Sequence, residues 1–585
     1  MRLQAAVAAA IITAMTLTGA TALAEPSADF DYGGTGRYDQ PWHGFAPAWL
    51  TLRDANPADV GLDPAPIAGA LDAVTGWTKP GPAGHPMFSG AVTLMVHDGA
   101  VVADQPAGYA VRYSDGAGTE LPPDQRVPMA RDTIFDMASV SKLFTSIAVM
   151  QQVEAGRVDI NAPVARYLPE FAANGKGSIT VVQLLTHTSG LLPDPVPSLW
   201  QGYPDIPSRV RAIMETTPAN PPGTTYSYSD INLMTLGLLV AKVSGSTLDG
   251  LVREGITAPL DMSDTGYNPP ASKLDRIAAT EFQTSPPRGM VRGQVHDENA
   301  WSLGGVAGHA GVFSTAHDMA VLGQTILNGG TYRGHRILRE DTVRQMLTNF
   351  NAKFPGDSHG LGFELDQRWY MAGLNSANSA GHTGYTGTTL VLDPESRSIA
   401  ILLTNRVHPS RNWGTINPAR RAVADGLARS MAVRPRQGST EWTATAAADQ
   451  AVTLSTKQLP VRGKTMRVSF DAFVDVDAED GDQLALQSSA DGVAWQPVPV
   501  LAEGVGAPQG PQPALAAYGH RRWWRVSAEL PATGFLRWQF TKAGIYFGRG
   551  VYLDGIRVQD SRGVLLDAER DPGALTAQGW SVVSR

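Results

Sequence analysis

The chain has 585 residues, too many for one hydrophobic core, so two or more domains are expected. Its hydrophobic content of 43% and charged content of 17% are those of a globular protein rather than a disordered one. A formal net charge of −8 and a pI near 5.9 argue against a nucleic-acid partner and against binding to an anionic membrane surface.

The N-terminus predicts a secretory signal peptide. Arg2 precedes a small apolar run from Ala5 to Ala20, and Ala22-Leu-Ala24 before Glu25 matches a cleavage site. We expect residues 1–24 to be removed and the protein to be secreted or periplasmic. An uncleaved anchor is the less favoured alternative, because the run is short and is interrupted by Thr and Gly. No later segment predicts a transmembrane span, and the absence of cysteine excludes disulfides and a lipidated cysteine.

Residues 25–56 are rich in Gly, Pro and aromatic residues without a clear period, and they predict a loose N-terminal arm. A helix is predicted from the N-cap Asp63 to Val74, with proline early in its first turn. Asp98-Gly99 separates two apolar, β-rich runs and predicts a hairpin over 89–102.

The rest of the first 432 residues contains both helical and strand-like patterns. Helices are predicted at 143–152, 181–190, 232–243, 316–327 and 419–431, and strands at 361–365, 388–392 and 399–404. Strands at both ends with helices between them indicate an α+β domain over 57–432, whose sheet is assembled from distant segments.

A polar linker over 433–440 leads into a region of period two. Short strands at this spacing over 441–585 predict an all-β sandwich domain with no catalytic pattern. Four of its aromatic residues are a candidate glycan-stacking face, although core packing is the commoner use of such side chains: Trp495, Trp523, Trp524 and Trp538.

The strongest chemical signal is Ser139-Val-Ser-Lys142 at the start of a predicted helix. Residues three apart share a helix face, so the Lys142 amine can reach the Ser139 hydroxyl. A serine becomes a useful nucleophile when a neighbouring base takes its proton. Chance pairs of this kind are common, but this is the one Ser-x-x-Lys in the sequence, and it follows an apolar run that would bury the lysine stem.

Three further stretches are candidates for the same site. Tyr226-Ser-Tyr-Ser-Asp230 offers the phenol of Tyr228 as a second base, or simply an aromatic at a helix start. Gly381-His-Thr-Gly-Tyr-Thr-Gly-Thr388 leads into a strand, and its glycines allow the backbone to approach a substrate. The glycine-rich run over 303–315 is either a packing loop or a wall of a cleft.

Ser139-Val-Ser-Lys142, Tyr228-Ser-Asp230 and His382-Thr-Gly384 occur in the order of the three motifs of penicillin-recognising serine hydrolases. Over roughly residues 57–432 the chain resembles the class C β-lactamase-related group, which includes low-molecular-weight penicillin-binding proteins and carboxylesterases. The resemblance implies a β-lactamase/DD-peptidase-like domain, in which an antiparallel sheet is flanked by helices and joined by a helical subdomain.

The resemblance also implies roles. Ser139 is the expected nucleophile, Lys142 its proton partner and Tyr228 the general base. The amides of Ser139 and Tyr385 are the expected oxyanion hole, and Asp230, His382, Thr383, Gly384 and Tyr385 are expected to bind substrate.

Two positions depart from the usual motifs. Asp230 stands where Asn is usual, and its charge would hold Lys142 protonated and favour Tyr228 as the base. His382 stands where β-lactamases often have Lys, and a partly charged His anchors a carboxylate less well. These departures favour a peptidase or an esterase over an efficient β-lactamase.

Competing motifs are weaker. Gly356-Asp-Ser-His-Gly360 matches a nucleophile elbow but lacks the strand and helix around it. His296 and His309 show no metal-ligand spacing, so no metal or cofactor is expected. We therefore expect an exported acyl-enzyme serine hydrolase acting on D-Ala-containing cell-wall peptides or on small esters and amides. A non-catalytic cell-wall binder is the alternative, and a metal-dependent hydrolase is a weaker third.

Overall fold

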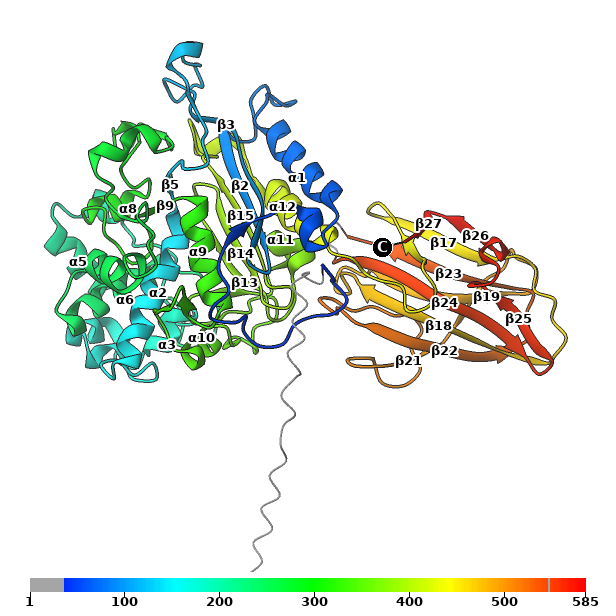
Figure 1. The fold of residues 1–585 in the computed structure, drawn as a ribbon. Coiled ribbons are helices and arrows are strands. Elements are labelled where there is room, and N and C mark those ends of the chain that lie inside the picture. Colours follow the sequence, from blue (N-terminus) through cyan, green and yellow to red (C-terminus); the bar gives the residue numbers. More distant parts are fainter. Residues whose placement is uncertain (1–35, 545–547, 585) are drawn as a thin grey trace, which may run out of the picture.

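A computed structural model describes residues 36–544 and 548–584. The predicted signal peptide and the first part of the arm lie outside the described residues. The chain forms an α+β part followed by an all-β sandwich, and the two lie side by side (Figure 1).

The α+β part is built on a sheet in the order β1-β3-β2-β15-β14-β13-β12, with β4 paired to β3. Apart from the parallel β1–β3 pair, its neighbours are antiparallel. The strands are β1 (Arg53–Asp54), β2 (Gly90–His97), β3 (Ala100–Val111), β4 (Val127–Pro128), β12 (Glu364–Leu365), β13 (Ala380–Thr383), β14 (Thr388–Asp393) and β15 (Ser398–Thr404). The predicted hairpin is confirmed: Asp98 and Gly99 have φ values of 45° and 75°, which a tight primed turn requires.

Helices cover both faces of this sheet (Figure 1). On one face α1 (Pro64–Trp77) packs with α12 (Asn417–Ser430) over Ala91 and Met95. On the other face α2 (Ser141–Glu154) and α9 (Ala316–Leu327) pack over the alternate side chains Val92 and Leu94. This alternation is the period of two expected of a strand buried on both sides.

A helical region extends from α2, away from the sheet (Figure 1). It contains α3 (Val181–Leu185), α4 (Leu199–Gly202), α5 (Ile206–Met214), α6 (Asp230–Ser244), α7 (Leu248–Val252) and α8 (Glu298–Ser302). Two small sheets link it to the remainder. One has three strands in the order β5 (Phe135–Asp136), β9 (Val312–Ser314) and β6 (Gly266–Tyr267), and the other pairs β7 (Phe282–Gln283) with β8 (Gly289–Met290). The hairpin β10 (Thr331–Tyr332) and β11 (His335–Arg336) and the helices α10 (Glu340–Met346) and α11 (Arg368–Met371) complete this part.

Two predicted elements are shorter than expected. The helix predicted over 181–190 ends at Leu185, because His187 adopts a left-handed φ of 55° that a helix cannot continue. The strand predicted over 361–365 is reduced to Glu364–Leu365, since Gly362 has a φ of 93°. Over 36–544 and 548–584, no single helix is long and apolar enough to cross a membrane. The bent pair Asp230–Ser244 and Leu248–Thr257 meets that test together, by length and composition only.

The sandwich consists of two antiparallel sheets around one apolar core. One sheet contains β21 (Leu501–Glu503), β22 (Trp523–Pro531), β18 (Thr465–Asp475), β24 (Gly550–Asp560), β16 (Glu441–Ala444), β27 (Trp580–Val583) and β25 (Gly563–Asp567). The other contains β20 (Gln496–Val498), β19 (Gln483–Ser489), β23 (Phe535–Lys542), β17 (Gln450–Thr456) and β26 (Leu575–Gln578).

The sandwich buries most of its tryptophans. Trp523, Trp524 and Trp538 are buried, and Trp495 is half-buried with the Arg537 guanidinium 4.3 Å from its ring centre. The four side chains therefore do not form an exposed stacking face. This removes the sequence-based reason for expecting a glycan contact through residues 441–585.

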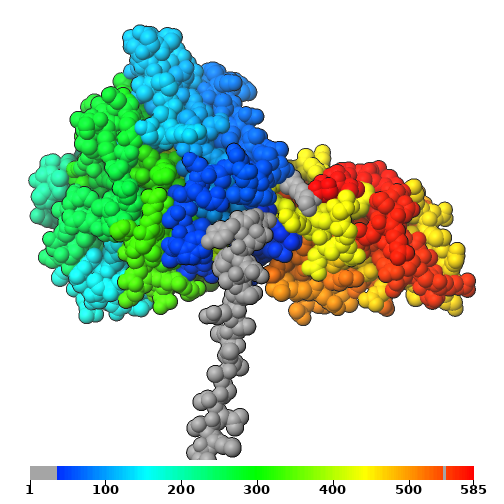
Figure 2. Space-filling view, in the orientation of Figure 1, coloured from blue at the N-terminus to red at the C-terminus, as the bar shows by residue number. Residues whose placement is uncertain are grey.

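The described part of the N-terminal arm is not loose, contrary to the prediction. Tyr38 is buried, and its hydroxyl donates to the Gly373 carbonyl at 2.7 Å and lies 2.9 Å from an Asp475 carboxylate oxygen. The arm thus lies where the α+β part meets the sandwich (Figure 2). Beside it Arg521 and Asp393, both fully buried, form an ion pair of 2.6 Å across the same junction.

Candidate active site

Ser139 lies in a strained turn at the start of α2. The preceding Ala138 has a φ of 45°, a left-handed conformation that is costly for a residue with a Cβ. The buried Asp136 carboxylate supports the turn by accepting from the Ala138 amide at 2.9 Å and from the His296 amide at 2.6 Å. The turn is therefore fixed by a side chain that the sequence motif does not include.

Lys142 is surrounded by acceptors. Its ammonium donates to the Ser139 hydroxyl at 2.9 Å and to the His309 carbonyl at 3.1 Å, and it lies 2.7 Å from the Asp230 carboxylate. Burial alone lowers the pKa of Lys142, but Asp230 and Tyr228 outweigh it and hold the pKa above its usual value. Since an ammonium has three donors and no acceptor, the protonated Lys142 acts as a donor to the Ser139 hydroxyl in this geometry.

Tyr228 lies beside both residues. Its ring centre is 4.9 Å from the Lys142 ammonium, and its hydroxyl is within hydrogen-bonding reach of Lys142 and Ser139. Burial raises the pKa of Tyr228 to about 12, although Lys142 opposes this, and Asp230 adds to the rise. His187 stacks on the ring at 4.6 Å, and its Nδ1 accepts from the Ser229 amide at 3.0 Å, which fixes the loop that carries Tyr228.

The glycine-rich run over 303–315 is a packing loop behind the site. A Cβ on Gly308 would lie 1.9 Å from the Leu233 carbonyl oxygen, so only glycine fits there against α6. On the other side of the loop, Thr145 of α2 donates to the Gly308 carbonyl at 2.8 Å. The close approach brings the next carbonyl, that of His309, to Lys142.

The turn after β13 is tied to the nucleophile. Thr386 donates to the Asp136 carbonyl at 2.7 Å, and Thr388 donates to the Met137 carbonyl at 2.9 Å. A Cβ on Gly384 would lie 2.1 Å from the Thr388 hydroxyl, so this position also requires glycine. Within the described residues, no hydrogen bond engages the Tyr385 amide, which leaves it available to an oxyanion.

His382 is buried, only 1% exposed, and its ring centre lies 6.1 Å from that of Tyr228. Burial lowers its pKa to about 3, with Lys142 adding to the effect, so the ring is neutral at physiological pH. Its Nδ1 donates to the Thr383 carbonyl at 2.8 Å. His382 therefore supplies no positive charge for a substrate carboxylate, and it lies behind the pocket wall rather than in it.

A cavity of about 620 Å³ opens at Ser139. Its lining includes the predicted residues Tyr228, Thr383, Gly384 and Tyr385, and further residues that the sequence did not single out: Asp357, Glu364, Gln367, Trp369, Arg406, Gly414, Thr415, Ile416 and Arg420. All eight predicted site residues lie in one region of the described structure. Asp230 and His382 do not line the cavity, but Asp230 pairs with Lys142 and the His382 ring lies beside that of Tyr228.

Arg420 supplies the positive charge that His382 lacks. It extends from α12 and donates to the Gly384 carbonyl at 3.1 Å and to the Thr389 hydroxyl at 3.0 Å. Burial, aided by Arg406, lowers its pKa to about 10, so it stays cationic at neutral pH. No sequence motif pointed to Arg420, because it comes from a helix that precedes the linker and meets β13 only in the folded chain.

A cluster of charged residues beside Lys142 satisfies its own charges. Asp230, Asp297 and His309 bring ligand atoms within 4.8 Å of one another, a spacing that suits a metal ion. In this structure Asp230 pairs with Lys142, and His309 lies 3.0 Å from Asp297, so these groups partner their neighbours.

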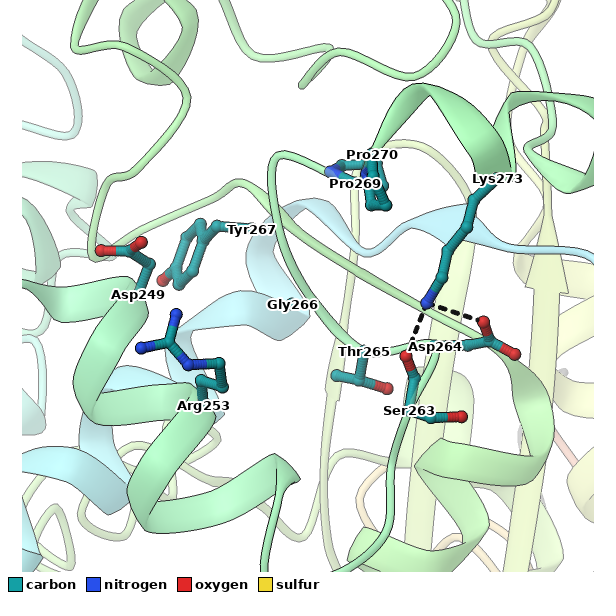
Figure 3. A pocket seen from close by; sticks show the side chains of 10 residues that line it. All are labelled: Asp249, Arg253, Ser263, Asp264, Thr265, Gly266, Tyr267, Pro269, Pro270 and Lys273. Atoms are coloured by element: carbon teal, nitrogen blue, oxygen red, sulfur yellow. Dashed lines mark hydrogen bonds and ion pairs between the residues drawn. The ribbon is translucent and has the colours of Figure 1, made fainter.

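A separate cavity of about 190 Å³ lies between α7 and the 263–273 loop (Figure 3). In it the Lys273 ammonium points to Asp264 at 2.9 Å and to the Ser263 carbonyl (Figure 3). It contains none of the predicted site residues.

Comparison with known proteins agrees with this geometry. A family profile described as beta-lactamase matches residues 82–425. The chain belongs to the β-lactamase family. It is a serine hydrolase related to β-lactamases and penicillin-binding proteins, as the motif order indicated.

Its relatives include proteins of Salmonella schwarzengrund and Salmonella typhimurium, each named "Putative D-alanyl-D-alanine carboxypeptidase". Each is 32% identical over 405 residues, which cover 64% of this chain and 90% of the relative. A penicillin-binding protein homologue from Caulobacter crescentus has the same β-lactamase fold. It is 23% identical, has a TM-score of 0.50, and covers 63% of this chain and 99% of its own.

Proposed function

We propose that the chain is an exported DD-carboxypeptidase that forms an acyl-enzyme on Ser139. The observation that carries the proposal is the contact between the Ser139 hydroxyl and the Lys142 ammonium, at 2.9 Å, beside Tyr228 in an open pocket. The names of the Salmonella relatives support D-alanyl peptides as the substrate class. The leader pattern over 1–24 supports export. We assign catalysis to residues 57–432 and an accessory role to 441–585, joined by the linker 433–440.

In acylation the Ser139 oxygen attacks the carbonyl carbon of the penultimate residue, and its proton passes to the Tyr228 oxygen. The amides of Ser139 and Tyr385 stabilise the oxyanion. The C–N bond then breaks, and Tyr228 returns the proton to the leaving amine. A water molecule later attacks the ester carbonyl by the same route, releasing the shortened peptide and restoring Ser139.

Lys142 acts in this scheme as a fixed cation. Its three acceptors hold it protonated, so it orients Ser139 and favours the tyrosinate by charge. Asp230 opposes the second effect because it neutralises Lys142. The expected result is a base with a high pKa and turnover that increases at alkaline pH.

The terminal carboxylate of the peptide is assigned to Arg420 and Thr383. Arg420 donates to the Gly384 carbonyl of the β13 turn, and Arg406 donates to the Tyr385 carbonyl of the same turn at 2.9 Å. The assignment is to Arg420 because it contacts the turn from a more buried position. His382 is neutral and buried, so its role is assigned to packing against Tyr228 rather than to charge.

An esterase is the second candidate, since a small ester needs no carboxylate anchor and the pocket is open to solvent. A slowly acylating cell-wall binder is the third. The same experiment separates them. The purified protein is incubated with an acyl-D-Ala-D-Ala peptide, a fluorescent penicillin and a short-chain nitrophenyl ester, with Ser139→Ala as the control.

Release of D-alanine and stable penicillin labelling, both lost in Ser139→Ala, are the expected results. Rapid ester turnover without D-alanine release would favour the esterase. Labelling without any turnover would favour the binder.

A further inference from the structure

Three residues that line the pocket have no part in the scheme above: Tyr226, Asp357 and Glu364. They line one pocket, and burial raises the pKa of Tyr226, with the charges of Glu364, Tyr228 and Asp357 adding to the rise. Tyr226 precedes α6, and Glu364 begins β12. Segments far apart in the sequence thus form one wall of the pocket.

Glu364 lines the pocket, and the Tyr370 hydroxyl is its hydrogen-bonding neighbour. It lies opposite Gly381 in the β12–β13 ladder, so its side chain leaves the sheet on the same face as that of Thr383. Its Oε2 is buried and has no hydrogen-bond partner, and no ion pair to Glu364 occurs within the described residues. Against burial, the Tyr370 hydroxyl does most to lower the pKa of Glu364, and Arg420 lowers it further without forming an ion pair.

A second acceptor without a hydrogen-bond partner lies behind Tyr226. The His359 ring centre is 6.2 Å from that of Tyr226, and its Nδ1 donates to the Gly360 carbonyl at 2.7 Å. Its Nε2 therefore bears the lone pair, and this atom is buried without a partner in a residue that is 1% exposed. Buried polar atoms rarely lack partners, and those of Glu364 and His359 are both acceptors. One Tyr370 hydroxyl satisfies neither the second carboxylate oxygen nor His359, so the group that completes this wall is a further donor.

Two carboxylates beside an aromatic face favour a cation with several N–H donors. In the described ranges, the group with metal-ligand spacing is Asp230, Asp297 and His309, and it does not include Glu364. An organic ammonium fits the wall better than a metal ion, because it donates in several directions and tolerates a wider site.

The leaving group of the proposed reaction is released into the pocket that this wall lines. Tyr228, which returns the proton to the leaving amine in the proposed mechanism, lines the same pocket as Tyr226 and Glu364. Arg420 and Thr383 line it as well, and they are assigned to the terminal carboxylate. The released residue therefore meets a cationic group and an anionic wall together.

We propose that Tyr226, Asp357 and Glu364 form an ammonium subsite, and that the enzyme prefers peptides whose released C-terminal residue is a diamino acid. This inference rests on the proposed function, and it deepens that function by giving the leaving group a side-chain amine. Burial raises the pKa of Glu364 to about 7, so the carboxylate form that binds a cation prevails above neutral pH. The preference is expected to weaken as the pH falls below that value.

The test compares two peptides that end in D-Ala-D-Lys and D-Ala-D-norleucine, which have side chains of similar length with and without the amine. The released amino acid is quantified, and the ratio of the two kcat/KM values is determined. The wild type is expected to favour the lysine peptide by about 10- to 100-fold, the value of a charge-assisted hydrogen bond. In Glu364→Gln the ratio is expected to fall to within a few-fold of unity, while Glu364→Asp retains part of it.

An equal rate on both peptides in the wild type, or an unchanged ratio in Glu364→Gln, would overturn the subsite. If neither peptide is cleaved, the proposed peptidase function fails, and a second measurement still tests the wall. D-lysine and D-norleucine are compared as competitors of Ser139 labelling by a fluorophosphonate. Protection by D-lysine alone, lost in Glu364→Gln, supports the subsite, and equal protection by both amino acids overturns it.

Discussion

Replacement of Asp230 by Asn tests how the catalytic base is tuned. The change keeps an acceptor oxygen for Lys142 but removes the charge that lies 2.7 Å from the ammonium. Asp230 raises the pKa of Lys142 and also that of Tyr228, so its loss lowers both. Each change makes a deprotonated base more abundant near neutral pH.

The size of the effect follows from the pKa of Tyr228. A pKa of about 12 leaves a phenolate fraction of about 10⁻⁵ at pH 7, which increases tenfold with each pH unit. The wild-type rate of acylation is therefore expected to rise steadily between about pH 7 and pH 10. Each unit by which Asp230→Asn lowers that pKa multiplies the neutral-pH rate by about ten.

The assay is the burst or turnover of a nitrophenyl ester across this pH range, corrected for spontaneous hydrolysis. In Asp230→Asn the rising limb is expected to end at a lower pH, and the rate at pH 7 is expected to exceed that of the wild type. Two profiles that superimpose, or a wild-type profile already flat from pH 7 to 9, would refute the reasoning. The variant is also expected to lose about 1–3 kcal/mol of stability, because Lys142 keeps its other acceptors but loses a buried counter-charge.

Further outcomes are expected from other parts of the structure. Tyr228→Phe is expected to lower the acylation rate by about 10²- to 10⁴-fold, the usual worth of a general base, without changing the melting temperature; an unchanged rate would rule out the base assignment. Glu281 has its pKa lowered to about 2, because its hydrogen bonds to His296 and Arg411 outweigh the effect of burial. Its ionised form therefore contributes at most about 3 kcal/mol above its unfolded pKa, and this is lost as the pH falls toward 2; urea titrations of Glu281→Gln are expected to show the full deficit at pH 7 and a clearly smaller one at pH 3. Arg521→Met leaves the buried Asp393 unpaired and is expected to cost about 3–5 kcal/mol in a denaturant titration, whereas an intact stability would mean that the pair contributes nothing.

The parts of the fold that were predictable are those determined by local patterns. The helix over 316–327 has the predicted bounds, because its apolar residues repeat at helical spacing behind the N-cap Thr315. The hairpin at Asp98-Gly99 was also evident, since its turn residues tolerate a positive φ. In the same way, Ser139 and Lys142 meet because three residues along a helix start suffice to bring them together.

The parts that were missed depend on distant partners. The N-terminal arm has no internal pattern, and Tyr38 finds its partners 335 and 437 residues further along the chain. Arg420 and Glu364 are ordinary charged residues in their own segments, and only the packing of α12 and β12 against β13 brings them to the pocket. The charge state of His382 likewise depends on burial, which the motif does not encode.

The position of Tyr38 also bears on the order in which the chain can be completed. The ribosome makes Tyr38 well before the carboxylate that it contacts, because Asp475 of β18 lies 437 residues further along the chain. The contact between Tyr38 and Asp475 therefore cannot form until the sandwich has been made. A nascent chain that stops after the α+β part would lack the Asp475 partner of Tyr38. It would also expose the surface around Asp393 that the sandwich covers, and surfaces exposed during folding promote aggregation. In this molecule a strand of the sandwich thus fastens a residue that lies 437 positions earlier in the chain.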